Sequence, residues 1–251
     1  MIRVLRTLQT YAPAVRPLKF GFYNALTRYL GWHVEIEFKL LSRMRGAGLA
    51  LDIGGNWGQS IWALKGAAAP RKIVSFEPNP ALSSRLQRVF ARDPGVQIEA
   101  CGLGDRAGGF TLYVPRYRNF VYDGLASLDE GEARNWLNAY RMARFDPKKL
   151  HVDEYQTPVR TLDSYGFEPD IVKIDVQGLE LQVVRGGLQT FSRCHPVTIV
   201  ETPEPALVKL FETLDMAPYR WTGSQLIRGD VSGINVLFLH ADRLKQLGLP
   251  G

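Results

Sequence analysis

The sequence has 251 residues, of which 45% are hydrophobic and 22% are charged. This composition is typical of a soluble domain with one sizeable core, and it excludes the disordered and fibrous classes. No apolar run approaches the roughly 20 residues that a membrane-spanning helix needs. Arg3 and Arg6 interrupt the apolar start that a secretory signal would require. We therefore expect a cytoplasmic protein.

The net charge of +6 lies in the first part of the chain. Residues 1–45 contain eight Lys or Arg and two Glu, which accounts for the whole excess. The other 206 residues are neutral, with 23 basic and 23 acidic side chains. A nucleic-acid-binding domain would spread its charge and carry a recognisable motif such as a zinc finger or a recognition helix. The sequence therefore predicts no nucleic-acid partner.

Two helices are predicted at the start of the chain. Apolar residues recur at helical spacing from Val4 onward, and Pro13 limits this first helix to about ten residues. A second helix is expected to end at Gly31, a typical helix-terminating residue. We interpret residues 1–45 as an N-terminal helical cap.

This cap combines basic residues with apolar ones such as Leu5, Leu8 and Phe22. In one interpretation, residues 1–30 lie on an anionic surface and hold the protein peripherally at the inner membrane. In the other, the apolar side chains pack on the rest of the protein while the basic ones face water. The sequence leaves both open.

Strands and helices alternate after the cap. Strands are expected at 49–53, 73–76 and 96–101, and the helices between them start at about residue 60 and at residue 80. Such an order is typical of a parallel sheet with helical crossovers. The fold class is therefore predicted to be α/β, with a mostly parallel sheet covered by helices on both faces.

The pattern breaks within 115–160, which contains one amphipathic stretch at 130–145 and no evident strand. We expect this insertion in the domain of residues 46–251 to form a lid over an acceptor. The alternation then resumes, and a final antiparallel hairpin is predicted. The expected elements are a strand at 171–176, a helix at 179–191, a strand at 196–200, a helix at 205–214 and hairpin strands near 225–228 and 234–240.

A glycine-rich turn follows the first predicted strand. Gly54 and Gly58 allow a positive φ and remove Cβ atoms from the approach of a ligand to the next helix. Asn56 stands where a dinucleotide-binding turn has its second glycine, and Asp52 adds a carboxylate just before the turn. An anion there disfavours a pyrophosphate and suits the ammonium and sulfonium of S-adenosylmethionine. A glycine-rich turn without a ligand is the alternative.

The next strand ends at Glu77, 19 residues after Gly58. An acid at about this interval reaches the ribose hydroxyls of an adenosine cofactor. The alternative role of Glu77 is a solvated carboxylate at the end of a strand.

Five ordered motifs resemble the FkbM family of methyltransferases over roughly residues 49–201. They are Asp52 to Gly58 (DIGGNWG), Phe76 to Pro80 (FEPNP), Gly102 to Asp105 (GLGD), Thr161 to Asp163 (TLD) and Lys173 to Glu180 (KIDVQGLE). The resemblance implies S-adenosylmethionine as cofactor, a Rossmann-like fold and O-methylation of a sugar or glycan hydroxyl. By the matching motifs, Asp52, Gly54, Gly58 and Glu77 would hold the methionine and ribose portions, and Asp105 would lie near the adenine.

The chain departs from the family pattern at two positions. Gln177 replaces a usual Glu, which removes one carboxylate, although its amide still has the groups to hydrogen-bond an acceptor hydroxyl. Trp57 is bulkier than the usual aliphatic residue.

Asp175 is the first candidate for the catalytic base. Its strand ends at the carboxyl edge of the sheet, where ligands bind in open α/β folds. Methyl transfer to an alcohol needs alignment and removal of the hydroxyl proton. The alternative is that Asp175 orients Lys173 or caps the next helix. Glu201 and Gln177 are candidates for acceptor binding, and a structural role at the end of its strand is the alternative for Glu201.

His151, in the insertion, is a second candidate for binding or deprotonating the acceptor, and the alternative is a surface histidine without such a role. The four histidines, which include His33, show no metal-ligand spacing, and no second carboxylate directly follows Asp175. We therefore assign no metal. Cys101 and Cys194 are expected to be buried free thiols.

Two other functions stay open from the sequence. An NAD-dependent oxidoreductase would need a glycine near Asn56 and a catalytic Tyr-Lys or His set, neither of which is evident. A non-catalytic cofactor-binding protein is the other possibility, because Gln177 departs from the family pattern.

Overall fold

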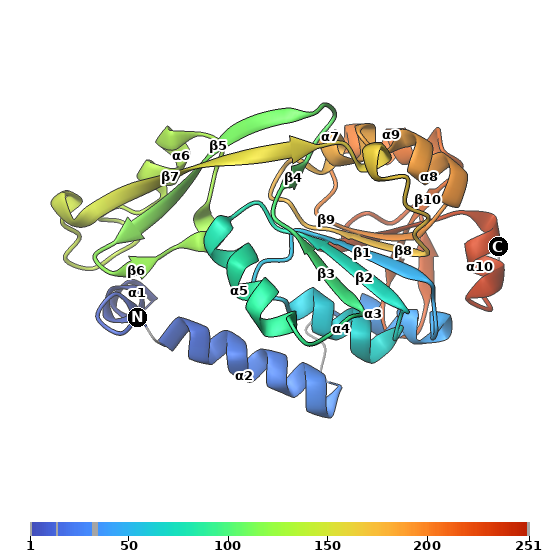
Figure 1. The fold of residues 1–251 in the computed structure, drawn as a ribbon, viewed down its shortest axis with the longest axis horizontal. Helices are drawn as coiled ribbons and strands as arrows, with labels where there is room; N and C mark the ends of the chain where they lie inside the picture. The colour runs from blue at the N-terminus through green and yellow to red at the C-terminus, as the bar shows by residue number, and fades with distance from the viewer. Residues whose placement is uncertain (1, 14, 32–34, 250–251) are drawn as a thin grey trace.

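The computed structural model describes residues 2–13, 15–31 and 35–249 (Figure 1). Its main sheet contains β1 (Leu49–Ile53), β2 (Lys72–Phe76), β3 (Val96–Glu99), β8 (Ile171–Ile174), β9 (Val197–Glu201), β10 (Ala217–Trp221), β11 (Leu226–Arg228) and β12 (Asn235–Leu239). The strand order is β11-β10-β12-β9-β8-β1-β2-β3. The strands from β9 to β3 in this order are parallel, and the other three are antiparallel. The predicted α/β fold class is confirmed.

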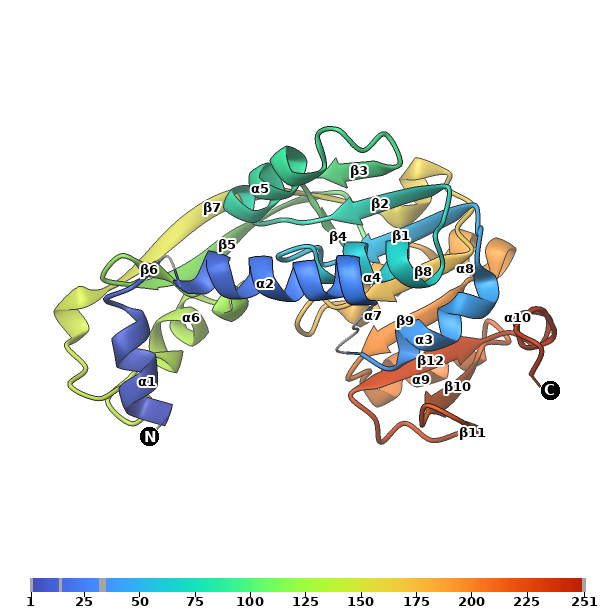
Figure 2. The ribbon, with the colours of Figure 1, turned by 90° about the horizontal axis from the view of Figure 1, so that it is seen from below.

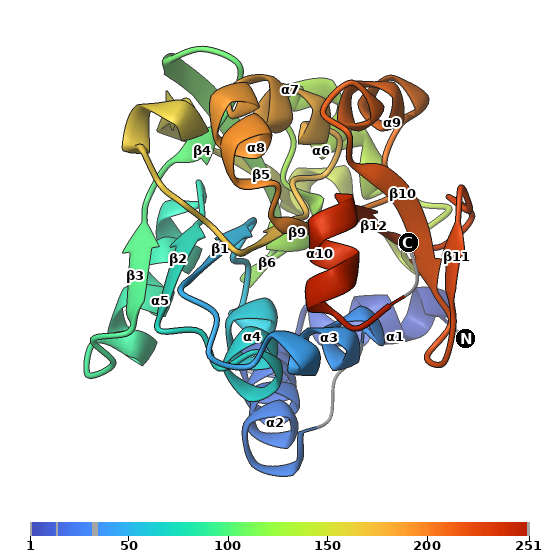
Figure 3. The same ribbon diagram turned by 90° about the vertical axis from the view of Figure 1, so that its right-hand side faces the viewer.

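Helices cover both faces of this sheet (Figure 3). One face carries α3 (Glu37–Leu40), the short helix η1 (Leu41–Met44), α4 (Gln59–Ala67), α5 (Pro80–Phe90) and α10 (Ala241–Gln246), and the other carries α7 (Glu180–Arg185), α8 (Leu188–Cys194) and α9 (Pro205–Glu212). Successive strand residues point to opposite faces. Ala50 therefore belongs to the first core cluster and Leu51 to the second. Burial on both faces explains the nearly continuous apolar strands of the sequence.

The helix expected at 179–191 is broken into α7 and α8. A Cβ added to Gly186 would lie 1.9 Å from the carbonyl oxygen of Gly104, so only glycine fits where the two backbones meet.

The closing strands also differ from the prediction. β11 pairs with β10, and β12 pairs with β10 and β9, so the hairpin is β10–β11.

A second sheet includes both ends of the region that was expected to lack strands. It contains β4 (Gly102–Leu103), β5 (Gly108–Tyr117), β6 (Phe120–Val121) and β7 (Leu150–Arg160) in the order β4-β7-β5-β6. The expectation was wrong because only Thr157 of β7 is buried, so polar residues occupy both sides of the strand. The strand predicted at 96–101 likewise ends at Glu99, and the chain continues into this second sheet.

The chain between β6 and β7 forms its own small core. It includes the short helix η2 (Asp123–Leu125), the helix α6 (Glu130–Trp136) and the short helix η3 (Pro147–Lys149). Buried Tyr117, Phe120 and Met142 hold the segment together. The amphipathic stretch expected at 130–145 is helical only in its first half. A fourth short helix, η4 (Leu162–Tyr165), connects β7 to the main sheet.

The N-terminal residues form α1 (Ile2–Gln9) and α2 (Val15–Leu30), and α2 runs beside α4 (Figure 2). The Asn24 side chain donates a hydrogen bond to the Trp57 carbonyl oxygen at 2.9 Å, and the Phe20 ring stacks on the Trp57 indole with centroids 4.9 Å apart. Gly31 has a φ of +63° after the last helical residue, as expected for a helix end. Within the described ranges, no helix is long and apolar enough to cross a membrane.

Candidate active site

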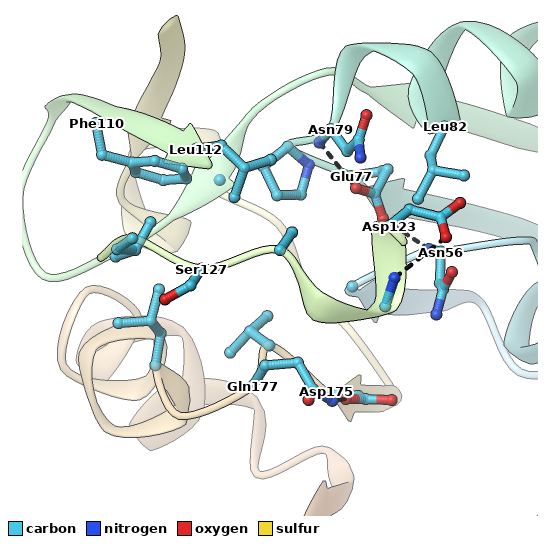
Figure 4. A pocket seen from close by; sticks show the side chains of 18 of the residues that line it. Asn56, Glu77, Asn79, Leu82, Phe110, Leu112, Asp123, Ser127, Asp175 and Gln177 are labelled. Atoms are coloured by element: carbon cyan, nitrogen blue, oxygen red, sulfur yellow. Dashed lines mark hydrogen bonds between the residues drawn. The ribbon is translucent and has the colours of Figure 1, made fainter. Parts of the chain in front are cut away.

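A cavity of about 690 Å³ lies between the carboxyl edge of the main sheet and the second sheet (Figure 4). This volume is in the usual range of ligand sites. Its lining from the main sheet includes Gly54, Asn56, Glu77, Asn79, Cys101, Asp175 and Gln177. Its lining from the second sheet and the following segment includes Phe110, Leu112, Asp123, Ser127, Glu132 and Trp136.

The glycine-rich turn forms one end of the cavity. Gly54 has a φ of +99°, and a Cβ on it would lie 1.9 Å from the carbonyl oxygen of Asp175. The turn after β1 and the end of β8 therefore meet backbone to backbone at this point. Gly58 also has a positive φ, but it packs against Leu86 of α5 and does not line the cavity. The two glycines thus have different roles, one at the ligand space and one in packing.

Glu77 follows β2 and is 5% exposed. One of its carboxylate oxygens accepts a hydrogen bond from the Asn56 backbone N–H at 2.7 Å, and the other accepts from the Asn79 backbone N–H at 2.8 Å. Burial raises the pKa of Glu77 to about 7, against the opposing effect of these two hydrogen bonds. Each oxygen keeps a second lone pair, so the carboxylate has acceptor capacity left for a ligand hydroxyl.

Asp52 lies beneath the glycine-rich turn and not in the cavity lining. Its side chain is fully buried, and Oδ2 accepts a hydrogen bond from the Ser75 hydroxyl at 2.7 Å. Burial raises the pKa of this carboxyl group. Among the described residues, Oδ1 has no hydrogen-bond partner. Asp52 is thus placed to act on a ligand through the turn and not by direct contact.

Asp175 and Glu201 lie side by side at the carboxyl edge, because they end the neighbouring strands β8 and β9. The Gln177 amide donates a hydrogen bond to Asp175 Oδ1 at 3.0 Å and to Glu201 Oε2 at 3.4 Å. A hydrogen bond with Asp175 is the main cause that raises the pKa of Glu201 to about 7, followed by burial. Asp175 and Gln177 line the cavity, and Glu201 stands behind them.

Two other predicted site residues do not reach this cavity. Asp105 is exposed, because the chain there turns along Gly186 away from the pocket. His151 is exposed on β7, opposite Arg116. Glu180, which closes the last family motif, is buried and accepts hydrogen bonds from the Val176 and Gly178 backbone N–H groups. It therefore shapes the turn after Asp175.

Asp123 is a cavity residue that sequence reasoning missed. Its carboxylate forms an ion pair with Arg16 of α2 and accepts a hydrogen bond from the Trp57 indole N–H at 3.0 Å. These contacts join the cap, the glycine-rich turn and the cavity wall. Only the adjacent Asp-Gly sequence, which favours a turn, was available as a signal. Ser127, Glu132 and Trp136 were missed as well, inside the region expected to form a lid.

Among the described residues, no group of three metal-binding side chains is present, and His33 lies outside those residues. Both cysteines are free. Cys101 is buried beside the cavity, whereas Cys194 is only partly buried.

A glycine-rich turn after β1, an acid after β2 and five parallel strands define a Rossmann-like domain of the methyltransferase class. The family model for the methyltransferase FkbM domain matches residues 52–217. The chain belongs to the FkbM methyltransferase family, as the sequence motifs predicted.

The individual relatives share less than 30% of their aligned residues with this chain. "Methyltransferase 1" of Beauveria bassiana is 29% identical over 146 residues, which cover 54% of this chain and 57% of that protein. "2-O-methyltransferase NoeI" of Sinorhizobium fredii is 24% identical over 148 residues, 57% of this chain and 58% of that protein. The chain thus spans little more than half the length of these relatives. A crystal structure of methyltransferase FkbM from Methylobacillus flagellatus aligns with a TM-score of 0.46 and 15% identity over 76% of this chain and 43% of that chain.

Proposed function

We propose that the protein is an S-adenosylmethionine-dependent O-methyltransferase that acts on a sugar or glycan hydroxyl. The observation that carries this proposal is the position of Glu77 and Asp175 on one cavity, on either side of the glycine-rich turn. This arrangement provides a site for the ribose of the cofactor and, at a separate point, a base for the acceptor.

The residues present fit the cofactor. Glu77 would accept from the ribose hydroxyls, and the turn at Gly54 and Asn56 would hold the methionine portion. The buried carboxylate of Asp52 favours a cation above the turn, because charges interact strongly where water is excluded. S-adenosylmethionine supplies an activated methyl group. We leave Asp105 out of the binding set, because its side chain lies outside the cavity lining.

The protein's own contribution to the transfer is alignment, exclusion of water and acceptance of a proton. Asp175 would take the proton of the acceptor hydroxyl as the new C–O bond forms. Residues 115–160 would cover the acceptor from the other side as a lid, and Gln177 would hydrogen-bond it. His151 is exposed on β7, so a role for it would require the acceptor to extend along that strand.

A hydroxylated acceptor fits the far wall of the cavity. Trp136 offers an apolar face, and Ser127 and Glu132, which hydrogen-bond each other at 2.9 Å, offer polar atoms for hydroxyl groups. The name of the Sinorhizobium relative, a 2-O-methyltransferase, supports methylation at oxygen.

The two other functions predict different ligand behaviour. An NAD-dependent oxidoreductase would place a pyrophosphate against the glycine-rich turn, above the buried carboxylate of Asp52, which repels it. A non-catalytic protein would bind S-adenosylmethionine without turnover. Calorimetry with S-adenosylhomocysteine and with NAD distinguishes the methyltransferase from the oxidoreductase. Transfer of labelled methyl groups to fractionated host glycans and glycolipids distinguishes it from a non-catalytic protein. Binding of NAD in place of S-adenosylhomocysteine would overturn the proposal.

We also propose that residues 1–30 contact an anionic membrane surface. The apolar side chains Val15, Leu18, Phe22 and Tyr29 share one side of α2 and are exposed, Leu18 by 71% and Phe22 by 61%. Val4 and Leu8 of α1 are exposed as well. Their exposure supports a contact outside the domain, whereas Phe20, on the opposite side of α2, packs on Trp57 as the alternative interpretation expects.

The positive charge of the N-terminal segment indicates which surface would cover the exposed apolar side chains of α1 and α2. Residues 1–34 contain five Lys or Arg and no Asp or Glu. Exposed apolar side chains among basic ones fit the interface of an anionic bilayer, where each basic residue adds about 1 kcal/mol. A membrane-held glycolipid is the acceptor that such a position would serve.

A further inference from the structure

The carboxyl groups of Asp175 and Glu201 are close enough to interact directly. Ile174 pairs with Val200 in the parallel register of β8 and β9, so the next residue of each strand stands at the same level. Gln177 Nε2 lies 3.0 Å from Asp175 Oδ1 and 3.4 Å from Glu201 Oε2, so the two carboxyl groups share one donor. A direct hydrogen bond between two carboxyl groups requires a proton on one of them, because an ionised carboxylate has no hydrogen to donate.

Gln177 holds the pair from above. Its φ of +55° belongs to the left-handed region, which turns its amide back over the strand ends. The amide nitrogen then donates to one oxygen of each carboxyl group. A glutamate at this position would add a third negative charge and no donor. The amide of Gln177 therefore supplies the donor that two adjacent carboxylates require.

The geometry points to Asp175 and Glu201 acting as one base, in which the proton taken from the acceptor hydroxyl becomes a single proton shared by the two carboxylates. This inference rests on the proposed function of the site. In the step, the bond from sulfur to the methyl carbon breaks and the C–O bond forms. The hydroxyl proton passes to Asp175, and the pair changes from two negative charges to one. Glu201 is a positioning residue that acts through Asp175.

The surroundings set the basicity of the pair. Lys173, which is 2% exposed, favours the ionised form of Glu201, while Glu35 and the Asp175 carboxylate oppose it. Asp52 is a further like charge facing Asp175. The balance brings the pKa of Glu201 to about 7. Like charges held together bind their first shared proton tightly, so the pair is a stronger base than one aspartate would be. Its fully ionised, active form increases as the pH rises through about 7.

Carbon-13 NMR of the protein labelled at its Asp and Glu carboxyl carbons tests the pair without any ligand. Two carboxyl groups are expected to titrate near pH 7, one lost in Glu77→Gln and the other in Glu201→Gln. The decisive variant is Asp175→Asn. It should move the Glu201 midpoint toward the ordinary value of about 4.3, by about two pH units, and leave the Glu77 midpoint in place. Glu212→Gln, an exposed carboxylate on α9, is the matched control and should leave both midpoints unchanged.

The pH dependence of labelled methyl transfer to the host glycan fraction provides the second measurement. The wild-type rate should rise through about pH 7, and Glu201→Gln should lose that rise while retaining calorimetric binding of S-adenosylhomocysteine. The inference is overturned if Glu201 titrates in the ordinary carboxyl range, or if its midpoint ignores Asp175→Asn. If the protein does not bind S-adenosylhomocysteine but Glu201 titrates near pH 7 and responds to Asp175→Asn as expected, only the proposed function is overturned.

Discussion

Arg16 of the N-terminal helix α2 forms an ion pair with Asp123 of the cavity wall. Their side chains are 18% and 7% exposed. Burial is the largest influence on both groups, lowering the pKa of Arg16 and raising the pKa of Asp123. Desolvation thus outweighs the mutual attraction. The pair adds little net stability, but either partner left alone is costly.

A double-mutant cycle tests this relationship. Arg16→Met should lower the free energy of unfolding by about 2–4 kcal/mol, because Asp123 then stays buried without its cation. Adding Asp123→Asn should recover at least about 1 kcal/mol of that loss. Denaturant unfolding monitored by fluorescence gives the four values. Strict additivity of the two substitutions would show that the pair is not coupled.

Glu77→Ala should weaken S-adenosylhomocysteine binding by about 1.5–3 kcal/mol, because a buried charged acceptor of ribose hydroxyls is removed. Isothermal calorimetry measures the change, and Glu212→Ala, which alters an exposed carboxylate, provides the control. Unchanged affinity in Glu77→Ala would remove Glu77 from the cofactor site.

The unfolding free energy should fall as the pH rises from about 4.5 to 7. The folded state raises the pKa of Glu77 to about 7, so it binds more protons in this window than the unfolded state does. A shift of this size corresponds to about 2–4 kcal/mol for the single group. Glu77→Gln, compared with wild type at both ends of the window, should reduce the pH dependence by about that amount. An equal slope in both proteins would contradict the buried, raised carboxyl group.

Asp175→Asn should preserve the fold and S-adenosylhomocysteine affinity but lower turnover by roughly 10²- to 10⁴-fold, because the amide keeps the shape and loses basicity. Labelled methyl transfer to the host glycan fraction measures the rate. If the rate stays at the wild-type level, the base lies elsewhere.

Vesicle co-sedimentation at low salt tests the membrane surface. The protein should sediment with vesicles rich in phosphatidylglycerol and not with pure phosphatidylcholine vesicles. A Leu18→Ser, Phe22→Ser double variant should lose this binding. Ile234→Ser, which removes an apolar side chain that is 68% exposed elsewhere, should keep it. Failure of the wild type to sediment with the anionic vesicles would refute membrane contact.

The short motifs were predictable because their backbone conformation depends mainly on residues close to them in the sequence. A glycine where φ must be positive, as at Gly54, and an acid at a strand end, as at Glu77, follow from the strand–turn–helix pattern. Spacing fixes the backbone but not the side-chain direction. For this reason Asp52 was expected to contact the cofactor, whereas its side chain points to Ser75 beneath the turn.

The cavity wall was not predictable because its contacts are distant in sequence. Asp123 is positioned by Arg16 and Trp57, which come from different regions of the chain. β7 was missed because its half-buried side includes the polar residues Asp153 and Thr157, which break the apolar alternation that predicts a strand.

Trp57 has a consequence for chimeric proteins. Its indole joins Phe20 of α2 to Asp123 of the cavity wall. A cavity wall transplanted from a relative without Asp123 would leave the Trp57 indole N–H without its hydrogen-bond acceptor. It would also leave Arg16 of α2 without its ion-pair partner. Exchange of acceptor specificity by grafting should succeed only when α2, residue 57 and the wall are transferred as one module.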